Sequence, residues 1–336
     1  MNSWPQNLWF LLIGFLCAVG IAWWLAKRWF QKKQRPEPKT GLLVLSSLVI
    51  GLALTSSTVT AWYYLRPQPA PVTQTLFEGV TYVREVRKVP RRVVIHVVTV
   101  DLKMDGLGFL VTPGKAGEKH PLTARTTSEF AREFQVQLAV NGDFFSPWYS
   151  NAPWDFYPGS GDAVTVHGIA ASRGAIYTEG ERKWDAPTLY LSKENRPTLI
   201  RPTNEIYNAI SGNIFLVREG KRGPEPIPEK NSLEPRTAIG FDKEGTKLFL
   251  VAVDGRQPFY SEGMDYDELI QVLVDHGAYS AINLDGGGST ALVVESKPGK
   301  WELLNCPIHT RIPGRERPSG NHLGVFLKKG GNASSP

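Results

Sequence analysis

The sequence predicts an α+β fold of the mixed α/β kind: one β-rich single domain with a few packed helices, preceded by two transmembrane helices. Short segments rich in Val, Ile, Leu and Thr recur between Gly, Pro, Asn and Asp residues, a pattern typical of strands. Only two segments combine helical periodicity with capping residues, and two long uncharged stretches lie near the N-terminus. The 336 residues suffice for one large domain and an anchor.

The first 66 residues are predicted to form a membrane anchor. Two uncharged stretches, 8–26 and 41–65, are long enough to cross a bilayer. The basic segment between them favours a cytoplasmic loop, which places both chain ends outside the cytoplasm. The alternative is a cleaved signal peptide followed by a buried helix. The remaining boundaries are a Pro-rich spacer over 67–73, the domain over 74–329 and a flexible tail over 330–336.

Charge argues against a nucleic-acid partner. The net charge is +6, and the first 66 residues hold seven basic residues and one acid. The remaining 31 basic and 31 acidic residues therefore cancel, so the domain lacks the positive surface that DNA or RNA binding needs. Cys17 and Cys306 are too few for a disulfide framework or a cysteine metal site.

Eight segments of the domain are predicted to be strands because they are short, apolar and bounded by turn residues. They are 80–86, 92–101, 137–140, 188–191, 198–201, 247–254, 281–285 and 291–295. Leu248–Val253 is apolar without alternation, which predicts a strand covered on both faces.

Two helices are predicted. The first is 128–134, where Thr126 and Thr127 provide N-cap chemistry. The second is 265–276, with Asp265 and Glu268 at capping-box spacing. Its predicted apolar face consists of Tyr266, Leu269, Ile270, Leu273 and Val274. We expect this helix to pack on the sheet without a catalytic role.

Three aspartates are the candidate catalytic residues. Asp143, Asp254 and Asp285 each follow an apolar strand and adjoin a glycine. Acids at strand ends beside small residues are common in active sites, so we expect the three to meet at one rim if their strands are neighbours. The alternative is that each aspartate only closes a turn.

The run from Gly286 to Thr290 is the most specific feature of the sequence. Its three glycines, Gly286, Gly287 and Gly288, predict a nest of N–H groups that binds an anion together with Ser289 and Thr290. A glycine hairpin between strands is the alternative.

Arg236 and Arg256 are the candidate anion-binding side chains, since a guanidinium binds a phosphodiester with two hydrogen bonds. Surface ion pairs are the alternative for both. The aromatic insert 144–157 could form a platform for a sugar or belong to the core. Histidine spacing indicates no metal site, and no nucleophile elbow for a catalytic serine is present.

Six motifs in this order resemble the phosphodiester glycosidase family. They are 139–145, 210–212, 236–240, 253–256 with 260–263, 283–289, and 316–318 with Asn321. The resemblance implies hydrolysis of a sugar-1-phosphate diester at the anomeric carbon. It adds Asn141 and Glu262 to the predicted substrate-binding residues.

The sequence thus predicts a membrane-anchored extracytoplasmic hydrolase, bacterial and either periplasmic or on the cell surface. Its expected partners are the membrane and a phosphodiester-linked glycan, with no required cofactor. A calcium ion among the three aspartates is the alternative role for these acids. Two other functions stay open: a non-catalytic module that binds envelope glycans, and a metal-dependent phosphodiesterase that cuts the P–O bond.

Overall fold

The computed structural model describes residues 27, 38–180, 186–223 and 232–327. The chain divides into two compact units, Met1–Pro67 and Gln68–Pro336. In the first unit, helix α2 (Pro38–Leu65) contains the predicted span 41–65. Among the described residues, no helix is long and apolar enough to cross a membrane. The other predicted span, 8–26, and the tail 330–336 lie outside the described residues.

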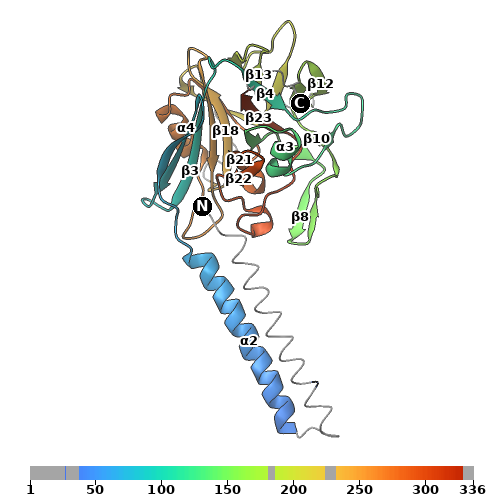
Figure 1. Ribbon diagram of the computed structural model, residues 1–336, viewed down its shortest axis with the longest axis vertical. Coiled ribbons are helices and arrows are strands. Elements are labelled where there is room, and N and C mark those ends of the chain that lie inside the picture. Colours follow the sequence, from blue (N-terminus) through green and yellow to red (C-terminus); the bar gives the residue numbers. More distant parts are fainter. Residues whose placement is uncertain (1–26, 28–37, 181–185, 224–231, 328–336) are drawn as a thin grey trace. The chain divides into compact units, whose positions relative to one another are not determined.

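The second unit is built on antiparallel sheets (Figure 1). The largest has eight strands, in the order β1 (Val72–Phe77), β2 (Val80–Arg87), β3 (Val93–Asp101), β19 (Lys247–Val253), β18 (Arg236–Phe241), β20 (Ser280–Asn283), β16 (Ile214–Arg218) and β17 (Lys221–Arg222). A five-stranded sheet has the order β22 (Lys300–Leu303), β21 (Leu292–Lys297), β6 (Leu138–Asn141), β23 (His322–Leu327) and β4 (Leu107–Val111).

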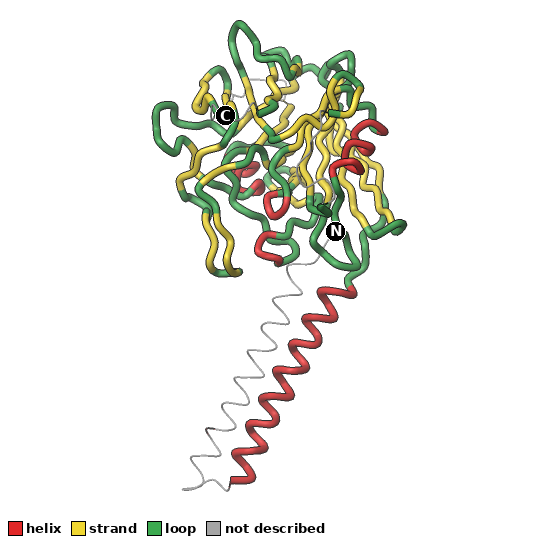
Figure 2. Tube along the Cα trace, turned by 180° about the vertical axis from the view of Figure 1, so that it is seen from behind, coloured by secondary structure: helices red, strands yellow, loops and turns green. Residues whose placement is uncertain are grey.

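Three smaller sheets complete the domain. One has the order β12 (Ala175–Glu179), β11 (Ile169–Ser172), β15 (Asn208–Ser211), β13 (Thr188–Leu191) and β14 (Pro197–Thr198). Another joins β5 (Leu122–Thr123), β10 (Ala163–Val166) and β7 (Phe145–Ser146). The last is a hairpin of β8 (Tyr149–Ala152) and β9 (Asp155–Tyr157). Figure 2 shows how strands dominate this unit, which confirms the predicted β-rich domain with few helices.

Seven of the eight predicted strands form, within a residue or two of their predicted bounds. The prediction of a strand over 198–201 was wrong, because β14 ends at Thr198. The Thr198 hydroxyl accepts a hydrogen bond from the Ile200 N–H at 3.0 Å, which turns the chain away from the sheet. The predicted spacer also differs, since β1 begins inside it at Val72 and pairs with β2.

Strand β19 lies between two cores, as its unbroken apolar run predicts. Leu248 and Leu250 pack with residues of the five-stranded β22–β4 sheet, including Leu138 and Leu323. Phe249, Val251 and Val253 instead pack with α4 (Tyr266–Asp275). Because neighbouring residues of a strand point to opposite faces, this central strand has no polar face.

Both predicted helices form with capping boxes. Thr126 caps α3 (Thr127–Glu133) together with Glu129, and Asp265 caps α4 together with Glu268. The predicted apolar face of α4 is correct except at Val274, which is exposed. Val272 is buried in its place, so the buried face is centred on Leu269 and Val272.

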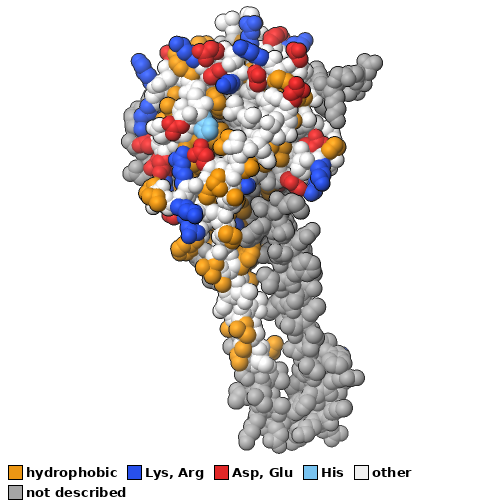
Figure 3. Space-filling view, turned by 60° about the vertical axis from the view of Figure 1, so that its left-hand side comes forward, with side chains coloured by type: hydrophobic (Ala, Val, Ile, Leu, Met, Phe, Trp, Pro, Cys, Tyr) orange, Lys and Arg blue, Asp and Glu red, His pale blue; other side chains and the backbone are white. Residues whose placement is uncertain are grey.

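The topology collects three chain segments at one edge. Strands β19 and β20 both pair antiparallel with β18, so they run in the same direction and end where β18 begins. The end of β6 joins this edge through a hydrogen bond from the Asp285 N–H to the Gly142 carbonyl at 2.9 Å. Basic and acidic side chains are interspersed on the face of the domain in Figure 3.

Candidate active site

Asp143 and Asp285 form a buried carboxylate pair. One oxygen of Asp143, Oδ2, accepts a hydrogen bond from the Gly168 N–H at 2.7 Å. Burial raises the pKa of Asp143 well above its usual range, and the neighbouring Asp285 carboxylate raises it further. Neighbouring buried acids disfavour double ionisation, so the pair is suited to share one proton.

The surroundings of the two acids differ. Burial also raises the pKa of Asp285, but the Arg317 charge, a hydrogen bond with Ser289, the Gly286 N–H and His167 all oppose this rise. Fewer groups oppose the rise at Asp143. The remaining negative charge is therefore better stabilised on Asp285, and the proton on Asp143.

Two arginines lie against the glycine run. A Cβ atom on Gly288 would lie 2.5 Å from Nη2 of Arg317, and one on Gly287 would lie 3.1 Å from Nη1 of Arg256. The absence of side chains at these glycines therefore makes room for both guanidinium groups. Burial and the charge of Arg256 lower the pKa of Arg317, while Asp285 raises it. The two guanidinium groups are chemically suited to a phosphate group, and Arg256 also forms an ion pair with Glu234.

Three side chains hold Arg317 in place. Its Nε donates to Nδ1 of His309 at 3.2 Å, and its Nη1 donates to the Ser289 hydroxyl at 3.3 Å. Its guanidinium also lies over the Trp148 ring at 5.0 Å. Burial and the charges of Arg317 and Arg315 lower the pKa of His309 to about 3, so this imidazole is a neutral acceptor at physiological pH.

The predicted anion nest does not form. Residues Gly287–Ser289 make a short 3₁₀ helix, η1. Within it, the N–H of Gly287 donates to the Pro235 carbonyl at 2.8 Å, and the N–H of Ser289 donates to Gly286 at 3.1 Å. These two N–H groups are occupied by the protein, which leaves the guanidinium groups packed on the glycines as the candidate anion-binding groups.

Asp254 does not join the acid pair, contrary to the predicted common rim. Its Oδ1 accepts from Asn305 Nδ2 at 3.2 Å and from the Cys306 N–H at 2.8 Å. Its Oδ2 contacts His96 Nε2 at 3.2 Å and the Tyr260 hydroxyl at 3.4 Å. Both carboxylate oxygens are occupied by buried protein groups, so Asp254 anchors the loop that carries Arg256 and we revise its role to structural.

Asn141 and Arg236 also act inside the protein rather than on substrate. Asn141 donates to the Asp285 carbonyl at 2.6 Å and accepts from the Thr237 hydroxyl at 3.0 Å. Arg236 donates to the carbonyls of Met264 at 3.1 Å and Ser232 at 2.7 Å. Its guanidinium lies 3.9 Å from the centre of the Tyr266 ring. Both side chains support the site, which corrects their predicted role in substrate binding.

The last two predicted binding residues, Thr290 and Glu262, differ in exposure. The side chain of Thr290 is buried and accepts a hydrogen bond from Thr237 at 3.2 Å. Glu262 is exposed, and its carbonyl accepts the Arg256 N–H at 3.3 Å. Of the predicted site residues, the structure therefore brings together Asp143, Asp285, Arg256, Ser289 and the three glycines.

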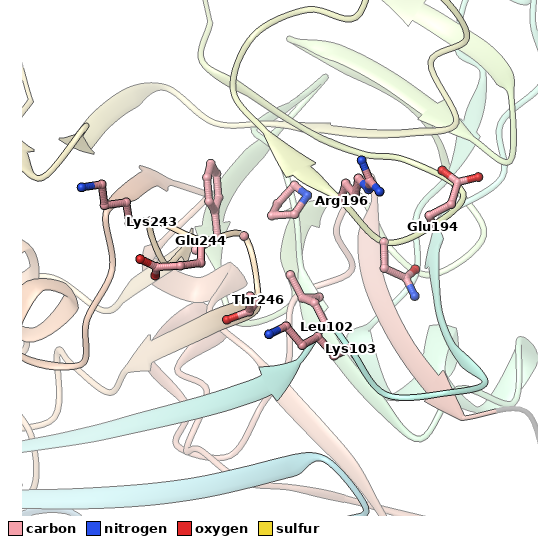
Figure 4. Close-up of a pocket in the computed structure, with 11 residues that line it drawn as sticks. Leu102, Lys103, Glu194, Arg196, Lys243, Glu244 and Thr246 are labelled. Carbon is pink, nitrogen blue, oxygen red and sulfur yellow. The ribbon is translucent and has the colours of Figure 1, made fainter.

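The described residues contain no group of three or more His, Cys, Asp and Glu side chains that could hold a metal ion. The three aspartates thus do not form the calcium site considered from the sequence. A separate surface hollow, lined by Leu102, Lys103, Glu194, Arg196, Lys243 and Glu244 among others (Figure 4), contains none of the predicted site residues. We assign no role to it.

Sequence reasoning missed Arg317, His309 and His167. Arg317 lies in the motif 316–318, so that motif could have identified it as a second anion-binding residue. His167 follows β10 and affects the pKa of Asp285, but nothing in its local sequence distinguishes it. His309 lies in the short 3₁₀ helix η2 (His309–Arg311) and likewise has no motif.

Comparisons with known proteins identify the family of the chain. Residues 134–326 match the family described as phosphodiester glycosidase, and the chain belongs to that family. The N-acetylglucosamine-1-phosphodiester alpha-N-acetylglucosaminidase of Bos taurus is 26% identical over 212 residues, covering 59% of this chain and 38% of the relative. The chain therefore spans well under half of that relative.

Two further comparisons are a bacterial relative and a solved structure. The SPbeta prophage-derived uncharacterized protein YomE of Bacillus subtilis (strain 168) is 32% identical over 127 residues, covering 37% of this chain and 18% of that protein. The solved structure is the catalytic domain of zebrafish N-acetylglucosamine-1-phosphodiester alpha-N-acetylglucosaminidase, auto-inhibited by its pro-peptide. It has a TM-score of 0.53 at 22% identity and covers 77% of this chain and 88% of that chain, a likeness of fold.

Proposed function

We propose that this protein hydrolyses a sugar-1-phosphate diester at the anomeric C–O bond. The observation that supports this proposal is that two arginines and two buried acids lie close together. The Arg256 and Arg317 guanidinium groups lie against Gly287 and Gly288. The buried acid Asp285 interacts with Arg317, and Asp143 interacts with Asp285. The substrate class follows the names of the relatives, which act on a sugar phosphodiester.

The two arginines bind the phosphate and stabilise the charge that it gains. When the C–O bond breaks, its electron pair goes to the phosphate oxygen, and the guanidinium groups hold the departing anion. Donors that are already oriented toward developing charge lower the barrier without reorganisation. His309 and Ser289 supply this orientation for Arg317.

Asp285 and Asp143 have different roles in the cleavage step. Asp285 is the ionised carboxylate. It either attacks the anomeric carbon as a nucleophile or accepts a proton from the attacking water as a general base. Asp143 carries the shared proton and donates it to the departing oxygen. Proton NMR of the first anomer released decides between the two roles of Asp285, because attack on carbon retains the configuration and attack by water inverts it.

The proposed bond cleavage is tested with the full chain in water enriched in heavy oxygen. A panel of sugar-1-phosphate diesters, including a uridine-diphosphate sugar, is incubated with and without calcium. We expect free sugar that carries the label. Label in the phosphate would identify a phosphodiesterase that cuts P–O. Binding of the diesters without any turnover would favour a glycan-binding module.

We further propose that the protein is anchored in a bacterial cell membrane with its domain outside the cytoplasm. The support is the pair of uncharged stretches, 8–26 and 41–65, on either side of a basic segment. We expect the full chain to stay in the membrane fraction after alkaline carbonate washing, and the domain to be accessible to protease added to spheroplasts. Release of the chain by carbonate would contradict the anchor.

A further inference from the structure

Tyr177 is a buried tyrosine that a β-bulge directs into the domain. Across the β11–β12 pair, Ala170 pairs with Thr178 and Ala171 pairs with Ile176, which leaves Tyr177 as the extra residue on β12. A bulge changes the direction of a side chain, and bulges are frequent next to active sites. Tyr177 is the only buried residue of β12, so this side chain alone enters the interior from that strand.

The Tyr177 hydroxyl lies next to the side chain of Asn321, which is also buried. Burial raises the pKa of Tyr177, the neighbouring Asn321 side chain opposes this rise, and the charge of Asp143 adds to it. Among the residues that the structure describes, neither the Tyr177 hydroxyl nor Nδ2 of Asn321 has a hydrogen-bond partner. A buried donor without a partner lowers stability, so two of them beside a buried acid indicate a function.

Asn321 is fixed to the backbone at Asp143. Its Oδ1 accepts a hydrogen bond from the Asp143 N–H at 2.8 Å, and its carbonyl accepts one from the Gly142 N–H at 2.9 Å. Gly168, whose N–H donates to Oδ2 of Asp143, directly precedes β11 in the chain. Because β11 pairs with β12, the strand pair that brings Gly168 to the acid also brings Tyr177.

The cleavage step places a new negative charge on this part of the site. When Asp143 gives its proton to the departing oxygen, the O–H electron pair stays on Asp143, whose side chain is buried. A buried carboxylate is unfavourable unless hydrogen-bond donors stabilise its charge. The Tyr177 O–H and the Asn321 amide N–H are donors without partners among the described residues before this step, so both are available to the charge that forms.

We propose that Tyr177 and Asn321 are positioning residues that stabilise the Asp143 carboxylate once it has given up its proton. This inference rests on the proposed function and adds the groups that set the strength of its acid. The other charged groups act in different ways: Asp285 raises the pKa of Asp143, while Arg317 and His167 lower that of Asp285. Tyr177 and Asn321 therefore supply neutral donors to a pair that already contains one negative charge.

The test is Tyr177→Phe, which removes the hydroxyl and keeps the ring that packs on Gly114. We expect kcat near neutral pH to fall roughly 3- to 10-fold, the effect of losing one hydrogen bond, without a fall in Tm. The decline of kcat at alkaline pH should move to higher pH, because the ionised form of Asp143 has lost a donor. Tyr190→Phe, at another buried tyrosine of the same sheet, is the matched control and should leave the decline in place. An unmoved decline in Tyr177→Phe, or a lower Tm as its only effect, would overturn the proposal.

A measurement without substrate separates this inference from the proposed function. The infrared C=O band of protonated Asp143, identified by its loss in Asp143→Asn, is followed against pH in the wild type, Tyr177→Phe and Tyr190→Phe. If the wild type cleaves no diester but the band persists to higher pH in Tyr177→Phe alone, the proposed function fails and the role of Tyr177 at Asp143 is supported. If the band titrates identically in all three proteins, the inference fails whatever the activity.

Discussion

Asp285→Asn is expected to lower kcat by about 10³-fold or more without unfolding the protein. The amide keeps the shape of the side chain but can neither attack carbon nor accept a proton from water. Because burial raises the pKa of Asp285, its ionised form is costly in the folded state, and removing the charge should leave Tm nearly unchanged. Sugar release and thermal unfolding, measured on one preparation, test both expectations.

Variants of Asp254 and Asp143 are compared with Asp285→Asn. Asp254→Asn should lower Tm, since Asp254 binds Asn305, Cys306 and His96, but it should retain more activity than Asp285→Asn. The wild-type rate should fall as pH rises through the raised pKa of Asp143, because the shared proton is then lost. Asp143→Asn should remove that decline along with most of the rate. A larger loss of kcat in Asp254→Asn than in Asp285→Asn would contradict our division of roles.

Arg317→Ala is expected to lower kcat by roughly 10²- to 10³-fold, the usual effect of removing one preorganised donor to developing charge. Arg317→Lys should recover little of this loss, since an ammonium group cannot form two parallel hydrogen bonds with a phosphate. The loss should be greatest for diesters with poor leaving groups, because these develop the most charge on the departing oxygen. Steady-state rates across a series of leaving groups measure this dependence.

The matched control is Arg201→Ala, which removes an exposed arginine that forms a surface salt bridge with Glu179. It should leave kcat and Tm nearly unchanged. Gly288→Ala tests the position of the Arg317 guanidinium without removing it, because the added Cβ would lie 2.5 Å from that guanidinium. We expect it to reproduce much of the Arg317→Ala loss. Normal turnover in Gly288→Ala would show that the position of this guanidinium does not matter.

Local sequence determined the regular elements of the domain. The capping boxes at Thr126 and Asp265 and the apolar run 248–253 act over a few residues. Their structures therefore follow from neighbours in the chain. The motifs around Asp143, Asp285 and the glycine run also indicated the right family.

Only the tertiary structure decided which polar residues make up the site. Asp254 and Asp285 have the same local pattern of strand, acid and glycine, yet one is enclosed by His96, Tyr260, Asn305 and Cys306 while the other adjoins Arg317. Arg236 and Arg256 also differ. Arg236 donates to backbone carbonyls, whereas Arg256 forms an ion pair with Glu234 and lies against Gly287. Whether a charged group is satisfied inside the protein or left to a ligand depends on partners distant in the chain. Local sequence specifies where an aspartate or an arginine stands, but tertiary packing specifies which groups surround it. Those groups determine the pKa of the side chain and its accessibility to a ligand.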